Sequence, residues 1–178
     1  MNNPQVDKVT NRFTTTLFII YLIALYWILL LKLGVQFSYM EQRNVNLVPF
    51  SEPIVLHGKA DFSEIILNIV IFIPLGLYAG ALFKKWNTGT KLFACFLVSL
   101  FVETLQFILA IGTFDVTDII TNTTGGMIGL LLFKAIEKAF NSHVKAQKFI
   151  NIVALTGTVV IIVFLALLKL NMLPIRYQ

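Results

Sequence analysis

The chain has 178 residues, of which 57% are hydrophobic and 13% are charged, whereas soluble domains average about 45–50% apolar and about 25% charged residues. After folding, a soluble domain of this size still exposes roughly 30% of the surface that its unfolded chain exposes. So apolar a composition therefore excludes a water-soluble monomer. The net charge of +5 comes from Lys and Arg scattered between apolar runs, which excludes a basic face for nucleic acid. The predicted partner is the lipid bilayer.

Five apolar stretches approach the roughly 20 residues that a helix needs to cross about 30 Å of hydrocarbon. In chain order they run from about Phe13 to Leu33, Ile65 to Phe83, Leu92 to Ile111, Asp115 to Phe133 and Phe149 to Leu170. The first has no small-residue cleavage site after it and is interpreted as a retained anchor. The sequence therefore predicts an all-α fold, a polytopic transmembrane helix bundle of about five spans that forms one membrane domain over residues 1–178.

The basic residues predict the orientation, because Lys and Arg concentrate in short cytoplasmic segments. With the N-terminus inside, nine of the fourteen Lys and Arg lie on the inner side and five on the outer side. Seven of the nine Asp and Glu then lie outside or in the outer half of a span. We therefore expect the N-terminus inside and the polar chemistry at the outer face.

Polar residues in the third stretch share one helix face. Ser99, Glu103 and Gln106 follow one another by four and three residues, a spacing that places them on one side of a helix. An ionised carboxylate inside a span costs at least about 2.5 kcal/mol, so an intramembrane glutamate indicates a functional site by default. The alternative is that Glu103 is neutral, or is hydrogen-bonded to a neighbouring helix purely for packing.

The fourth stretch opens with a second polar stripe. Asp115, Asp118 and Asn122 advance by three and four residues. Asp115 is either a binding residue or the N-cap of this helix, where a carboxylate accepts hydrogen bonds from unpaired amides. Asp118 and Asn122 lie one and two turns deeper, so capping does not explain them.

Small residues and a proline predict how the helices pack. Gly125 and Gly129 form a GxxxG spacing, and Gly126 continues the polar stripe, so this side of the helix is suited to close helix approach. Pro74 frees the carbonyl group of Val70 and predicts a kink in the second span. Such a kink either opens an outer cleft or is a detail of packing.

The outer ends of three spans supply one set of candidate residues. In the second span, Asn68 follows Glu64 by four positions, again at the outer end of the span. The candidate ligand-binding residues are Asn68, Glu103, Gln106, Asp115, Asp118 and Asn122. We predict that they form one outer polar pocket, within which the sequence assigns no catalytic residue.

Metal and cofactor sites are not predicted. Cys95 is the single cysteine and lies inside an apolar run, so neither an intramolecular disulfide nor a thiolate metal site is available. His57 lies in the first loop with no second histidine near it, which gives little support for zinc. We expect Cys95 to be a small packing residue.

Four motifs in order resemble the VanZ-like family of bacterial membrane proteins, over about Leu17 to Phe133. They are Asn46-Leu47-Val48-Pro49-Phe50, Asn68 with Ile71-Phe72-Ile73-Pro74-Leu75-Gly76, Glu103-Thr104-Leu105-Gln106, and Gly112-Thr113-Phe114-Asp115-Val116-Thr117-Asp118 with Asn122-Thr123-Thr124-Gly125-Gly126. The core motifs fall within about residues 46–133, and the span at about 149–170 is additional. The resemblance implies a multi-pass protein of the bacterial cell membrane and low-level resistance to the glycopeptide antibiotic teicoplanin. It implies no reaction.

Three functions fit this interpretation. The first is a non-enzymatic envelope protein whose outer pocket binds or alters a lipid or cell-wall precursor. The alternative is an intramembrane enzyme acting on a polyprenyl-phosphate or lipid substrate through outer carboxylates, although phosphoryl chemistry needs positive charge that the outer spans lack. A third is an ion-coupled or proton-coupled carrier, for which buried carboxylates serve as relays. Because the pocket is acidic, it favours an amine, a hydroxyl group or a bridging metal over a bare phosphate.

Overall fold

The computed structural model describes residues 4–31, 45–50, 55–56, 59–60 and 62–169. Its helices are α1 (Pro4–Leu31), α2 (Ser63–Leu82), α3 (Thr88–Ile108), α4 (Val116–Phe140) and α5 (His143–Lys169). Its strands are β1 (Val45–Asn46), β2 (Val55–Leu56), β3 (Lys59–Ala60) and β4 (Phe114–Asp115). The predicted all-α membrane bundle is confirmed, since the strands have two residues each. Among the described residues, four helical segments are long and apolar enough to cross a membrane, namely Asp7–Leu29, Ser63–Leu82, Thr88–Ile108 and Val116–Phe140.

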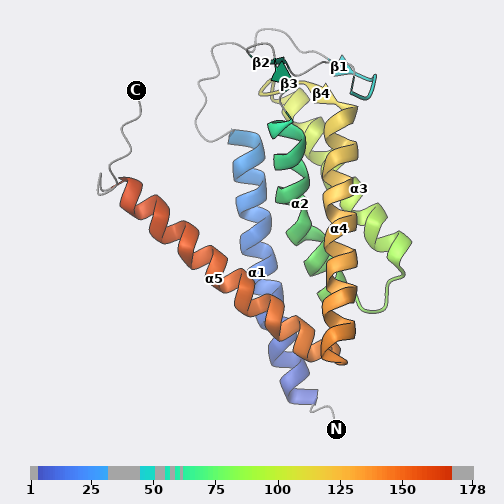
Figure 1. Cartoon of the computed structure of the whole chain (residues 1–178), viewed down its shortest axis with the longest axis vertical. Coiled ribbons are helices and arrows are strands. Elements are labelled where there is room, and N and C mark those ends of the chain that lie inside the picture. Colours follow the sequence, from blue (N-terminus) through green and yellow to red (C-terminus); the bar gives the residue numbers. More distant parts are fainter. Residues whose placement is uncertain (1–3, 32–44, 51–54, 57–58, 61, 170–178) are drawn as a thin grey trace.

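Helices α1 to α4 run alternately up and down beside one another (Figure 1). The last turns of α1 and α3, the first turns of α2 and α4, and the four strands meet at one end of the bundle, which we call the strand end. The start of α1 and the turns that join α2 to α3 and α4 to α5 lie at the opposite end. Helix α5 leaves the end of α4 and slants across α1, away from the other helices (Figure 1). That α5 forms a fifth span stays a prediction.

Several helix ends lie beyond the apolar stretches that predicted them, but α3 ends at Ile108, before the predicted Ile111, because the backbone turns at Ala110 with a φ of 54°. Helix α1 begins at Pro4 rather than Phe13, and α4 continues past Phe133 to Phe140. Hydropathy records the length of chain that suits hydrocarbon, whereas a helix continues into the polar interface as long as its backbone is hydrogen-bonded. The predicted span ends Leu33 and Leu170 lie outside the described residues, as does His57.

Glycines bring α4 into backbone contact with α2. A Cβ atom added at Gly125 or Gly129 would collide with a carbonyl oxygen of α2. On the adjacent side of α4, a Cβ atom added at Gly126 would lie 2.8 Å from Cβ of Cys95 on α3. Helix association in lipid depends on such close packing, because lipid chains are as apolar as the helix surfaces. The three glycines therefore fit α4 between α2 and α3.

A tyrosine from α1 bonds to the backbone of α2 near its proline. Pro74 lies inside α2, and the hydroxyl group of Tyr21 donates a 2.9 Å hydrogen bond to the carbonyl oxygen of Ile71. The sequence predicted an unpaired carbonyl at Val70, and Tyr21 bonds one residue further along the chain. Membrane helices tolerate proline where a neighbouring side chain supplies such a bond. The kink itself stays a prediction.

Candidate functional site

A cavity of about 270 Å³ opens at the strand end of the bundle. Five of the candidate residues line it, namely Asn68, Glu103, Gln106, Asp118 and Asn122. They come from α2, α3 and α4, while α1 contributes Ile28 and Leu29 and the turn before β4 contributes Gly112 and Thr113. Pockets for drug-sized ligands measure about 300–1,000 Å³. This cavity is therefore suited to one polar group of a larger molecule.

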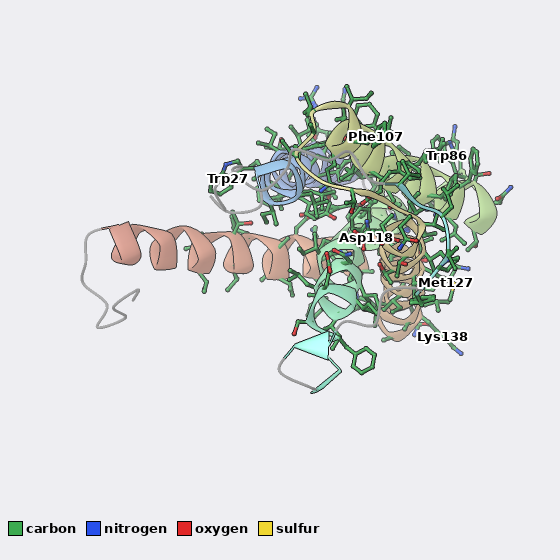
Figure 2. All side chains as sticks on the ribbon, turned by 90° about the horizontal axis from the view of Figure 1, so that it is seen from above. Trp27, Trp86, Phe107, Asp118, Met127 and Lys138 are labelled. Atoms are coloured by element: carbon green, nitrogen blue, oxygen red, sulfur yellow. The ribbon has the colours of Figure 1, made fainter. Side chains whose placement is uncertain are left out.

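Asp118 joins two walls of this strand-end cavity. The side-chain amide of Asn68 on α2 donates a 2.7 Å hydrogen bond from Nδ2 to Oδ1 of Asp118 on α4. Figure 2 shows Asp118 in the interior of the bundle, whereas Trp27 and Trp86 lie at its periphery. The bond crosses the same helix pair that the glycines hold together, so close packing sets its geometry.

Two buried residues of α3 form another wall. Glu103 is 2% exposed, and its Oε2 accepts a 3.3 Å hydrogen bond from the backbone amide of Asp115. Gln106 donates a 3.0 Å bond from Nε2 to the carbonyl oxygen of Leu29 at the end of α1. Both residues thus face the bundle interior, as their spacing predicted, and tie α3 to its neighbours.

Asn122 carries an acceptor that lacks a partner. The residue is 1% exposed, and its Nδ2 donates a 3.1 Å bond to Oγ of Ser99. Its Oδ1 is buried and has no hydrogen-bond partner among the described residues. A buried polar atom without a partner costs about 1–3 kcal/mol, and such an atom is uncommon in native proteins. Since Asn122 lines the cavity, a hydrogen-bond donor of a ligand would remove this cost.

Asp115 caps α4 and does not line the cavity. Its Oδ1 accepts a 2.6 Å hydrogen bond from the backbone amide of Thr117, and its Oδ2 accepts a 3.0 Å bond from Nδ2 of Asn46. Asn46 and Asp115 are also partners in the parallel pairing of β1 with β4. The structure thus shows the capping interaction that the sequence left open for Asp115.

The wall of the cavity is acidic. Glu64, Glu103 and Asp118 line it, and none of its described lining residues is Lys, Arg or His. Within the described part of the chain, no group of three or more His, Cys, Asp or Glu side chains could hold a metal ion. The arrangement is therefore suited to hydrogen-bond donors and positively charged groups.

Sequence reasoning left two residues out of the candidate set. Glu64 lines the cavity, and its position one turn before Asn68 was the available signal. Asn46 bonds to Asp115 across 69 positions of sequence. It lies in the two-residue strand β1, which is too short for a periodic pattern to indicate a partner.

The family is decided by a match over two thirds of the chain. The VanZ/LLP1 family matches residues 18–137. The chain belongs to the VanZ/LLP1 family. Protein VanZ of Enterococcus faecium is 37% identical to it over 156 residues, which cover 85% of this chain and 92% of that relative. No solved structure matches the chain. The family match contains every residue that lines the strand-end cavity, whereas α5 lies beyond it.

Proposed function

We propose that this protein is a multi-pass protein of the bacterial cell membrane, with its N-terminus inside, that confers low-level resistance to teicoplanin. In this proposal the strand-end cavity lies at the outer face and binds a hydrogen-bond donor group of a lipid or cell-wall precursor. Binding of that precursor by the cavity reduces the access of the antibiotic to its target. The membership of the VanZ/LLP1 family and the similarity to Protein VanZ support the link to resistance.

The unpartnered oxygen of Asn122 is the observation that carries the proposal. The same cavity wall presents the carboxylates of Glu103 and Asp118, which are acceptors when ionised. A hydroxyl or ammonium group of a ligand would donate to these oxygens, whereas a bare phosphate would be repelled. We therefore assign the cavity to a sugar hydroxyl or amine group of the precursor.

Binding without catalysis fits this charge pattern better than phosphoryl transfer. An enzyme acting on a polyprenyl phosphate needs cations against the charge that develops in its transition state. The described lining of the cavity contains three carboxylates and no basic side chain.

Susceptibility measurements test this proposal. The chain is expressed in a sensitive Gram-positive host, and the minimal inhibitory concentrations of teicoplanin and vancomycin are measured for the wild type, Glu103→Gln and Asp118→Asn. Asp7→Asn is the matched control, because Asp7 is an acidic residue at the opposite end of the bundle. We expect the two cavity variants to lose protection against teicoplanin at unchanged membrane levels, and Asp7→Asn to keep it. Full protection by both cavity variants would contradict the proposal.

A further inference from the structure

A second, larger cavity of about 670 Å³ lies at the opposite end of the bundle. Its walls come from the first turns of α1, the end of α2, the end of α4 and the start of α5. It shares no lining residue with the strand-end cavity. We call it the basal cavity.

The basal cavity is lined by lysines. Lys84, Lys134 and Lys138 face it, against the carboxylates of Asp7 and Glu137. Nζ of Lys134 donates a 2.8 Å hydrogen bond to the hydroxyl group of Thr88, a neutral partner that orients the ammonium group without cancelling its charge. Basic side chains thus outnumber acidic ones here, whereas the described lining of the strand-end cavity is acidic only.

A histidine contacts one of the two carboxylates. Nδ1 of His143 lies 2.7 Å from Oε1 of Glu137, and Nε2 lies 2.9 Å from the carbonyl oxygen of Ala81. This contact engages the carboxylate of Glu137, and the described lining of the cavity contains three lysines against two carboxylates.

The first turn of α5 adds a positive helix end. Helix α5 begins at His143, and Ser142, His143 and Val144 all line the basal cavity. The first amide groups of a helix have no partner within that helix, and its dipole is positive at this end. A helix start of this kind favours phosphate and other anions.

Buried hydrogen bonds fix the position of α5 beside the cavity. Gln147 is 1% exposed, and its Nε2 donates bonds of 2.9 Å to Oδ1 of Asn11 and 2.8 Å to Oγ1 of Thr14 on α1. Gln147 and Asn11 also line the cavity. These bonds hold the start of α5, and with it one wall of the cavity, against α1.

Exposed aromatic side chains place the basal cavity at the level of the lipid headgroups. Trp86 is 44% exposed and stacks on Phe83 with ring centroids 4.5 Å apart. Phe140 and Phe149 are also exposed, and their ring centroids lie 5.5 Å apart near the turn between α4 and α5. Aromatic residues gather at the boundary between hydrocarbon and headgroups. Figure 2 shows Trp86 and Lys138 at the periphery of the bundle.

We propose that the basal cavity binds the phosphate headgroup of an anionic phospholipid through Lys84, Lys134, Lys138 and the start of α5. Basic pockets between membrane helices on the cytoplasmic side are typical binding sites for anionic lipids. The ligand is a phospholipid rather than a soluble phosphate, because the cavity lies beside exposed aromatic residues at headgroup level. The inference shares with the proposed function only the orientation with the N-terminus inside, and its test is made on purified protein, where lipid binding is measured whatever the orientation in the cell.

Native mass spectrometry of the purified full chain in detergent tests the proposal. Phosphatidylglycerol and phosphatidylcholine with identical acyl chains are titrated separately, and bound lipid is counted. The cavity variant replaces three exposed lysines by glutamine: Lys84→Gln, Lys134→Gln and Lys138→Gln. The control variant removes the same charge from three exposed lysines that neither line the cavity nor lie in the first turn of α5: Lys8→Gln, Lys85→Gln and Lys148→Gln.

We expect the wild type and the control to prefer phosphatidylglycerol and the cavity variant to lose this preference, by about fivefold for each lysine that contacts the phosphate. Equal binding of both lipids by the wild type would overturn the proposal. So would an equal loss in the control, which would show that overall charge attracts the lipid. Displacement of phosphatidylglycerol by millimolar inorganic phosphate would overturn the assignment to a lipid. All six side chains are exposed, and melting followed by circular dichroism checks that each variant is folded.

Discussion

Asn68 of α2 and Asp118 of α4 share a 2.7 Å hydrogen bond between two helices whose backbones touch at glycines. A side chain at the glycine positions would move α4 away from α2 and separate Asn68 from Asp118. The polar wall of the strand-end cavity is thus a consequence of how closely α2 and α4 pack.

A double-mutant cycle on Asn68 and Asp118 measures this bond. A hydrogen bond to a charged group contributes about 1.5–3 kcal/mol, so we expect a coupling energy in this range between Asn68→Ala and Asp118→Ala. Unfolding of the four proteins in detergent by titration with SDS provides the free energies. If the two substitutions changed the free energy of unfolding additively, the contribution of Asp118 to stability would come from partners other than Asn68.

The glycine contact predicts a contrast between two substitutions. In Gly129→Ala, the new Cβ atom would collide with the carbonyl oxygen of Ile73 and lie 2.9 Å from Cα of Gly76. Overpacking of this kind costs about 1–3 kcal/mol. The matched control is Gly157→Ala in α5, where nothing lies within 4 Å of the added atom and alanine favours the helix by up to about 1 kcal/mol. Equal free energies of unfolding for the two variants would contradict the close contact between Gly129 and α2.

Two substitutions at Asp115 separate capping from ligand binding. Asn keeps an acceptor oxygen for the amide of Thr117, whereas Ala removes it at a cost of about 0.5–2 kcal/mol. Asn cannot also accept the bond from Nδ2 of Asn46, so we expect Asp115→Asn to keep the cap and protection against teicoplanin with a smaller loss of stability than Asp115→Ala. The measurements are unfolding in detergent and the minimal inhibitory concentration. A stable but sensitive Asp115→Asn strain would show that the carboxylate charge itself acts in resistance.

The sequence predicted which residues lie on one helix face better than it predicted their partners. Spacing placed Glu103 and Gln106 on the interior side of α3, and both line the cavity. The partner of Gln106 is a main-chain carbonyl oxygen, that of Leu29, and carbonyl groups carry no signal in a sequence. The bond from Asn46 to Asp115 was missed because the strand β1 has only two residues and so shows no period.

The direction of α5 was not predictable from hydropathy either. An apolar stretch such as Phe149 to Leu170 indicates that a helix is long enough to cross a membrane, but the tilt depends on its neighbours. Here the buried bonds from Gln147 to Asn11 and Thr14 hold the start of α5 against α1. Asn11 and Gln147 lie outside the apolar stretches on which the spans were predicted, and Thr14 lies at the edge of the first.

Labelling of single cysteines tests the orientation on which the proposed function depends. In a Cys95→Ser background, Thr113→Cys places a thiol in the exposed turn at the strand end, and Lys85→Cys places one in the exposed turn at the opposite end. We expect a membrane-impermeant maleimide to label Thr113→Cys in intact cells and to label Lys85→Cys after the cells are opened. The reason is that Lys and Arg concentrate at the opposite end, which the positive-inside rule places in the cytoplasm. The reverse pattern would place the acidic cavity inside the cell, where it could not meet an antibiotic that acts at the outer surface.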